Sequence, residues 1–320
     1  WDRQEILHHL RAWAVKGFFL AFMISIVPGG FRDIVNMNFT EVAANPVWIA
    51  NALITGMFLV DVQFATIGYM LTMKPLDAHI RTANPFLAGW VAALMCYPPF
   101  ILMNNGGPLD YHIGTSDWAY WFEGQTALLA VWGIWLVVLT AIYAWATVVF
   151  GIRFSNLTYR GVLTHGPYRF TRHPAYLSKN LFWWASVLPF MVTGGGWLEP
   201  VRNCIFLLVV NAIYYWRART EEAHLIAEDP KYAEYHAWME ERGFITAPLA
   251  RLKRRVFGGS AVPACEGHAQ PAEGLDSVDA RQTDIKQNGI RTAMVAACAD
   301  SGLCEGFFGR ADTFGLGVCN

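Results

Sequence analysis

Long apolar segments separated by short polar stretches dominate the first half of the chain. A helix needs about 20 mostly apolar residues to cross a bilayer. Four segments come close to or exceed that length: residues 12–29, 46–73, 85–103 and 126–150. The pattern therefore predicts four transmembrane helices before residue 151.

A further apolar pair follows a polar stretch. Residues 181–193 and 197–216 are separated by a run of three glycines, which favours a tight hairpin. Both arms are short, and Glu199 and Arg202 further interrupt the apolar sequence of the second arm. Such arms cross a thinned bilayer, or they enter it and return. We therefore expect an all-α, polytopic membrane helix bundle with about six spans.

The residues after the hairpin change from membrane-like to amphipathic. Over residues 220–242, Leu225, Tyr232, Tyr235 and Trp238 recur among charged residues, which predicts two short C-terminal amphipathic helices at the cytoplasmic interface.

Three regions follow from these patterns. Residues 1–125 hold the N-terminal spans and loops, and residues 126–250 form a core with the polar loop, the hairpin and the C-terminal helices. Residues 251–320 are expected to be a disordered tail, because from Gly258 onward Gly, Ala, Asp and Ser accumulate without periodicity.

The composition supports a membrane protein. Hydrophobic residues make up 54% of the chain, charged residues only 15%, and there are 14 Trp, which is too apolar and aromatic for an ordinary soluble domain. The formal net charge of −1 gives no reason to expect a nucleic-acid partner. The six Cys include no CxxC pair, so we expect neither a metal site nor a disulfide framework.

The distribution of basic residues predicts the orientation. Residues 104–125 contain no Lys or Arg, whereas residues 151–180 contain Arg153, Arg160, Arg169, Arg172 and Lys179. Basic residues collect on the cytoplasmic side of membrane proteins. We therefore expect an integral protein of a bacterial inner membrane, with both termini and residues 151–180 in the cytoplasm.

Two polar clusters border the hairpin, at residues 164–176 and 217–222. Pro174 suits the first turn of a helix, whose free N–H groups attract an anion, and Arg172 can fork onto a carboxylate. Placing such groups beside apolar segments is costly unless they bind something charged, so they are the candidate site. The alternative is that they only anchor the chain to lipid headgroups.

The order of motifs resembles the isoprenylcysteine carboxyl methyltransferase family, within a wider phospholipid methyltransferase-like membrane superfamily. The motifs are G-x-Y-x-x-x-R-H-P-x-Y, an apolar hairpin, R-x-R-x-E-E and Y-x-x-Y, and they cover residues 161–235. They comprise Gly166, Tyr168, Arg172, His173, Pro174, Tyr176, Arg217, Arg219, Glu221, Glu222, Tyr232 and Tyr235. The resemblance implies a cytoplasmic pocket for S-adenosylmethionine, with a lipid-like substrate entering from the bilayer.

The resemblance also implies roles for individual residues. The cofactor would contact His165, Gly166, Tyr168, Arg172, His173, Pro174, Tyr176, Glu221 and Glu222. Arg217 and Glu222 would lie nearest the acceptor and act in catalysis. The predicted enzyme is an S-adenosylmethionine-dependent methyltransferase acting on the polar head of a lipid-like or prenylated acceptor. Carboxyl O-methylation is favoured, and a carboxylate acceptor requires no general base.

Other functions remain open at this point. A sterol-type membrane reductase that uses NADPH has a similar C-terminal region, but its usual R-H-x-N-Y-x-G and D-E motifs differ from Pro174-Ala175 and Glu221-Glu222 here. A phospholipid N-methyltransferase is a closer alternative. Asp61, an ionisable residue inside the second apolar segment, would also suit a transporter or a non-catalytic membrane scaffold.

Overall fold

Helices form most of the computed structural model, which describes residues 2–194 and 196–257. The α-helices are α1 (Arg3–Val35), α2 (Phe39–Ala44), α3 (Pro46–Met70), α4 (Leu87–Leu94), α5 (Trp118–Trp121), α6 (Thr126–Phe150), α7 (Pro174–Val187), α8 (Leu198–Glu228), α9 (Pro230–Arg242) and α10 (Thr246–Phe257). The 3-10 helices are η1 (Lys74–Leu76), η2 (Gly151–Arg153) and η3 (Gly166–Arg169). Strands β1 (Thr82–Ala83) and β2 (Thr158–Tyr159) pair antiparallel.

Within the described residues, three helices are long and apolar enough to cross a membrane: α1, α3 and α6. They coincide with the first, second and fourth predicted spans, and they confirm an integral membrane protein. Local chemistry sets where α3 begins, because the Asn45 side chain accepts a hydrogen bond from the Val47 amide and Pro46 occupies the first turn.

The predicted span over residues 85–103 is wrong as a single helix. Helix α4 has eight residues there, about 12 Å, which is too short to cross a bilayer. Pro98 and Pro99 lack the N–H donors that would carry a helix onward. With α7 also short, at 14 residues, the count of about six spans stays a prediction.

The chain after β1 nevertheless follows α8 along much of its length. Asn84 lies against the Thr220 carbonyl (3.5 Å), and the Ile113 carbonyl accepts a hydrogen bond from Asn203 (2.9 Å). Thr220 and Asn203, the α8 residues in these two contacts, lie about 26 Å apart along the helix. Non-helical backbone at membrane depth is tolerated where protein covers it. Here Cys96, Met103 and Tyr111 share a buried cluster with Leu207, Val210, Ile213 and Tyr214 of α8.

The hairpin helices differ in length from the prediction. Helix α7 begins at Pro174 as expected, but α8 continues without a break from Leu198 through Glu228. Only α9 is a separate helix in the amphipathic region, and the Asp229 side chain caps it by accepting from the Lys231 amide. One rigid helix therefore carries both the second hairpin arm and Arg217–Glu222. Of the predicted tail, residues 251–257 continue α10, and residues 258–320 lie outside the described part of the chain.

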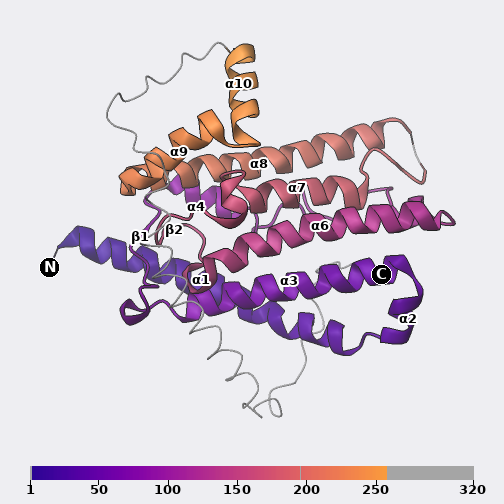
Figure 1. Cartoon of the computed structure of the whole chain (residues 1–320), viewed down its shortest axis with the longest axis horizontal. Helices are drawn as coiled ribbons and strands as arrows, with labels where there is room; N and C mark the ends of the chain where they lie inside the picture. Colours follow the sequence, from indigo (N-terminus) through magenta and orange to yellow (C-terminus); the bar gives the residue numbers. More distant parts are fainter. Residues whose placement is uncertain (1, 195, 258–320) are drawn as a thin grey trace. The chain divides into compact units, whose positions relative to one another are not determined.

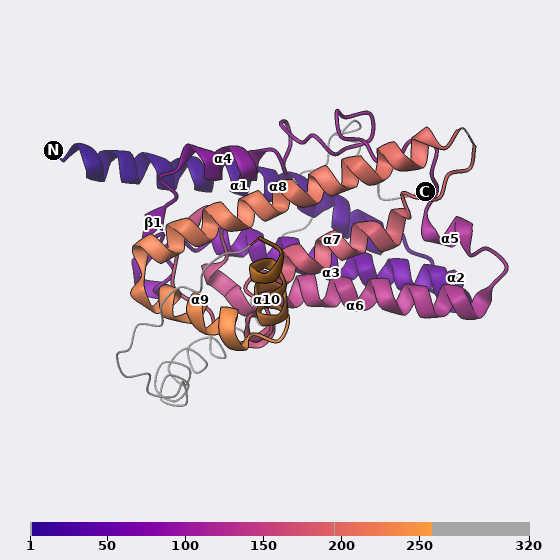
Figure 2. The same ribbon diagram turned by 90° about the horizontal axis from the view of Figure 1, so that it is seen from above.

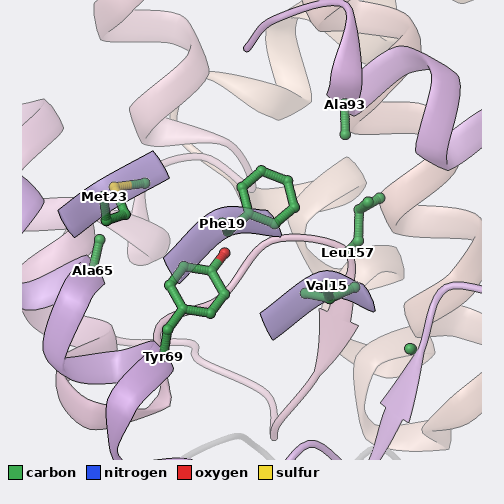
Figure 3. Packing of buried hydrophobic residues seen from close by; sticks show 8 residues of the cluster. Val15, Phe19, Met23, Ala65, Tyr69, Ala93 and Leu157 are labelled. Atoms are coloured by element: carbon green, nitrogen blue, oxygen red, sulfur yellow. The ribbon is translucent and has the colours of Figure 1, made fainter. Parts of the chain in front are cut away.

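Neighbouring helices pack in the order α1, α3, α6 and α7, while α4 packs against α8 (Figures 1 and 2). Figure 3 shows the core between α1 and α3, where the Phe19 ring lies beside Tyr69. The two rings stack at 5.8 Å, and Leu157 joins the same cluster from the loop after α6. This core fixes the loop that leads into the candidate site.

A buried arginine holds the same loop against α3. Arg160 donates to the carbonyls of Phe154 (2.7 Å), Ile152 (2.9 Å), Gly68 (3.0 Å) and Ala78. Burial lowers the pKa of Arg160 to about 10, but the guanidinium remains charged at neutral pH. Carbonyls at the ends of α3 and near η2 carry partial negative charge, which stabilises this cation.

The orientation of the helices can be tested by labelling. We expect Glu123→Cys, before α6, to react with an impermeant thiol reagent added outside cells, because the predicted orientation puts the basic residues on the other side of the membrane. Thr164→Cys, after α6, should react only when membranes are opened. Both positions are exposed. A variant background without native cysteines ensures that each signal comes from the introduced cysteine. Labelling of position 164 but not of position 123 in intact cells would show that the orientation is the reverse of the predicted one.

Candidate functional site

A buried arginine joins the hairpin to the loop after α6. The Arg217 side chain, on α8, is only 2% exposed. Its Nε donates to Glu221 Oε1 (3.1 Å), one helical turn on, and its Nη2 donates to Asn156 Oδ1 (2.6 Å). The guanidinium also lies over two aromatic rings, 5.1 Å from the centroid of Tyr176 and 5.4 Å from that of Tyr97. The charge is therefore paired, hydrogen-bonded and enclosed by aromatic faces.

Sequence reasoning missed the residues that support Arg217 from outside the motifs. The Asn156 backbone N–H and its Nδ2 both donate to the Tyr69 hydroxyl, at 2.7 and 3.0 Å, and Nδ2 also reaches the Tyr97 hydroxyl at 3.4 Å. Tyr69 comes from α3, so one of the N-terminal spans reaches the site through this network. No spacing in the sequence marks Asn156, because its partners are distant along the chain.

Glu222 lies at the centre of a second group of charges. Its Oε1 accepts from Arg172 Nε (2.7 Å) and His173 Nε2 (3.0 Å), and its Oε2 accepts from Arg219 Nη1 (2.6 Å). The carboxylate side chain is 3% exposed. The R-H-P and R-x-R-x-E-E motifs, separate in the sequence, thus meet on one carboxylate.

Tyr176 connects the two groups. Its hydroxyl donates to Glu221 Oε1 (2.6 Å), the same oxygen that Arg217 binds, and its ring stacks on His173 at 5.5 Å with nearly parallel planes. We call Arg172, His173, Tyr176, Arg217, Glu221 and Glu222 the charged cluster. All six are among the residues predicted from the sequence.

Electrostatics keep Glu222 ionised. Burial alone would raise the pKa of Glu222, but the hydrogen bond from His173, the nearby imidazole of His236 and the charges of His173 and Arg172 outweigh it, so the pKa lies well below the usual 4.5. Glu222 is consequently an anion throughout the physiological range.

The remaining predicted residues lie outside the charged cluster. His165 is exposed just before η3, and the described contacts do not bring it to the cluster. Tyr168 faces α6, with its ring edge-on to Phe150 (5.3 Å) and its hydroxyl near the Ala146 carbonyl (3.4 Å). Gly166 has a positive φ of 61° and closely approaches Val149, which leaves little room for a side chain. Pro174 is buried at the start of α7.

Helix α9 adds two polar residues that the sequence reasoning did not name. Glu240 Oε1 lies 3.5 Å from Arg172 Nη1. His236 Nε2 lies 3.6 Å from Glu222 and is buried without a hydrogen bond in the described part of the structure. Their i, i+4 spacing, which places both on one face of a helix, was the available signal. The Tyr235 hydroxyl fastens α9 to this region by donating to the Tyr168 carbonyl (2.6 Å).

The donors and acceptors gathered here suit a small zwitterionic or cationic ligand. Carboxylates can hold an ammonium group and arginines can hold a carboxylate, while the rings of Tyr97 and Tyr176 already face the Arg217 guanidinium. Among residues 2–194 and 196–257, no three His, Cys, Asp or Glu side chains are arranged to hold a metal ion.

Fold and site together define a helical membrane protein with a buried charged cluster where α7, α8 and α9 meet. Residues 125–227 match the model of the Isoprenylcysteine carboxyl methyltransferase (ICMT) family, which confirms the predicted resemblance. The matched segment contains α6, α7 and nearly all of α8 with the six cluster residues. The match indicates a membrane methyltransferase. Neither the curated proteins nor the solved structures gave a match to this chain.

The charge on Glu222 should be visible in stability against pH. A depressed carboxyl pKa contributes stability that is present above the unfolded pKa, about 4.3, and is lost as pH falls toward the folded value. We expect Glu222→Gln to cost about 3 kcal/mol at pH 7, because it leaves Arg172 and Arg219 without their anion. Thermal unfolding in detergent should show a constant gap from wild type above about pH 5 that narrows below about pH 4. A gap independent of pH would contradict the assigned charge.

Proposed function

We propose that this protein transfers the methyl group of S-adenosylmethionine to the carboxylate head of an amphiphilic, lipid-like acceptor at the cytoplasmic face of a membrane. The family match over residues 125–227 supports methyl transfer, and α1, α3 and α6 support a bilayer location. The observation that carries the proposal is the junction of the R-H-P and E-E motifs on Glu222.

The charged cluster fits S-adenosylmethionine by its chemistry. Glu221 and Glu222 provide anions for the ammonium group of the cofactor, and Arg172 can form a bidentate pair with its carboxylate. Buried His236 Nε2, which lacks a hydrogen bond in the described structure, offers a further polar contact.

When bound, S-adenosylmethionine supplies an electrophilic methyl group, so the protein needs to provide position and electrostatics. Arg217 is held by Glu221 and Asn156 and is therefore oriented before any ligand arrives. We infer that it directs an anionic acceptor toward the cluster, while Glu222 keeps Arg172 and His173 in place. A carboxylate acceptor is already a nucleophile at neutral pH, so no side chain has to remove a proton.

The acceptor is expected to be amphiphilic because the charged cluster borders the apolar hairpin. Helix α7 begins at Pro174, next to Arg172 and His173, and becomes apolar from Leu181, and α8 returns from apolar sequence to Arg217–Glu222. A head held at the cluster would leave its chain beside α7 and α8. A substrate that is entirely water-soluble would not require this placement.

Cofactor binding is tested by calorimetry on detergent-purified protein. We expect micromolar affinity for S-adenosylmethionine in wild type, and a loss of at least about tenfold in Arg172→Ala and Glu222→Ala, because each removes a charge-assisted contact. Arg169→Ala is the matched control, since Arg169 is an exposed arginine of the same loop. Unchanged affinity in both cluster variants would refute the site.

The acceptor class is tested with a radiolabelled methyl donor on membrane extracts. We expect the label to partition into the organic phase and to be released as methanol by mild base, as for a methyl ester. Arg217→Ala should reduce turnover more than cofactor binding, because Arg217 is assigned to the acceptor. Label found only in water-soluble compounds, or base-stable label in lipid, would contradict carboxyl methylation of an amphiphile.

A further inference from the structure

Lys179 places a positive charge one helical turn deeper in the hairpin than the charged cluster. On α7 it follows Tyr176 by three residues, and on the antiparallel α8 Tyr214 precedes Arg217 by three. The Tyr214 ring contacts both, lying 5.5 Å from the Tyr176 ring and 5.7 Å from the Lys179 ammonium. Lys179 is therefore a neighbour of the cluster on the side from which the acceptor chain would extend.

Three aromatic rings surround the Lys179 ammonium. Its Nζ lies 5.4 Å from the ring centroid of Trp183, 5.5 Å from that of Tyr143 and 5.7 Å from that of Tyr214, so α6, α7 and α8 each contribute one wall. Cation–π attraction holds the ammonium there. The residue as a whole is half-buried.

The charge of Lys179 has no close anion in the described structure. No carboxylate of those residues forms an ion pair with it within 4.0 Å. Asp61 of α3 acts on Lys179 through its charge, but it is hydrogen-bonded by the Thr147 hydroxyl. A cation beside apolar helices without a close partner is costly, and such residues in membrane proteins usually serve a ligand.

The same arrangement disfavours an amine-bearing acceptor. Aromatic cages of this kind bind quaternary ammonium groups, but here an ammonium of the chain itself already fills the cage. A second cation would meet an occupied cage and would be repelled by the like charge of Lys179. An anion would instead be attracted by the Lys179 ammonium. Discrimination by repulsion as well as attraction is an effective route to specificity.

We propose that Lys179 selects an acceptor with a carboxylate head and excludes one with an ammonium head. This inference rests on the proposed function, since it concerns the acceptor of that site. Lys179 is a specificity-determining residue and takes no part in bond making. On this proposal, the charge of Lys179 favours carboxyl methylation over amine methylation.

The test compares three amphiphiles of equal chain length: myristate, myristylamine and myristyl alcohol. Full-length protein in a neutral detergent at pH 7 is titrated with each by calorimetry. We expect wild type to bind myristate more tightly than the alcohol and the amine least. Lys179→Met should weaken myristate binding by about 10- to 100-fold and improve amine binding, whereas Lys179→Arg should keep the wild-type order. An unchanged order in Lys179→Met would overturn the proposal.

A competing role is that Lys179 only neutralises Asp61. In that case Lys179→Met would be unstable, and the double variant Lys179→Met with Asp61→Asn would regain both stability and the wild-type preference for myristate. We expect the double variant to fold but to prefer the alcohol or the amine. Regained preference for myristate would overturn the proposal even if the single variant cannot be purified.

Failure of the proposed function would be recognised separately. Lys179→Met should bind S-adenosylmethionine as wild type does, because the charged cluster is intact. Absence of S-adenosylmethionine binding in wild type, with head selectivity still dependent on Lys179, would reject the methyltransferase and retain the anion-binding residue.

Discussion

The burial of the Arg217 guanidinium is the constraint on which the site depends. A cation removed from water is stable only if every side of it is compensated. Glu221, Asn156, Tyr97 and Tyr176 provide that compensation from α8, the loop after α6, the segment after α4 and α7. Since these segments are far apart in sequence, satisfying one charge fixes their mutual positions. The position of the site is thus a consequence of folding.

The neighbouring Glu222 applies the same principle with opposite sign. One buried carboxylate gathers Arg172 and His173 from the start of α7, Arg219 from its own helix and His236 from α9. Arg217 and Glu222 are only five residues apart on one helix, yet they face different partners. Helix α8 therefore acts as a rigid rod that holds the acceptor side and the cofactor side of the proposed site at a fixed distance.

Local chemistry made part of this predictable from the sequence. Pro174 predicted the start of α7, the apolar run at 126–150 predicted α6, and i, i+4 spacing placed Arg217 beside Glu221. The prediction of the third span was wrong because an apolar segment can pack along another helix as well as cross a bilayer. Composition alone does not distinguish these two arrangements. Asn156 and Tyr69 were missed because their role arises only when distant segments meet.

The central claim is that the charged cluster binds S-adenosylmethionine, and titration of the purified wild-type protein tests it most directly. Calorimetry with S-adenosylmethionine and, separately, with NADPH distinguishes the methyltransferase from a reductase that has a similar C-terminal region. The account predicts saturable binding of S-adenosylmethionine and none of NADPH. Binding of NADPH without binding of S-adenosylmethionine would contradict it.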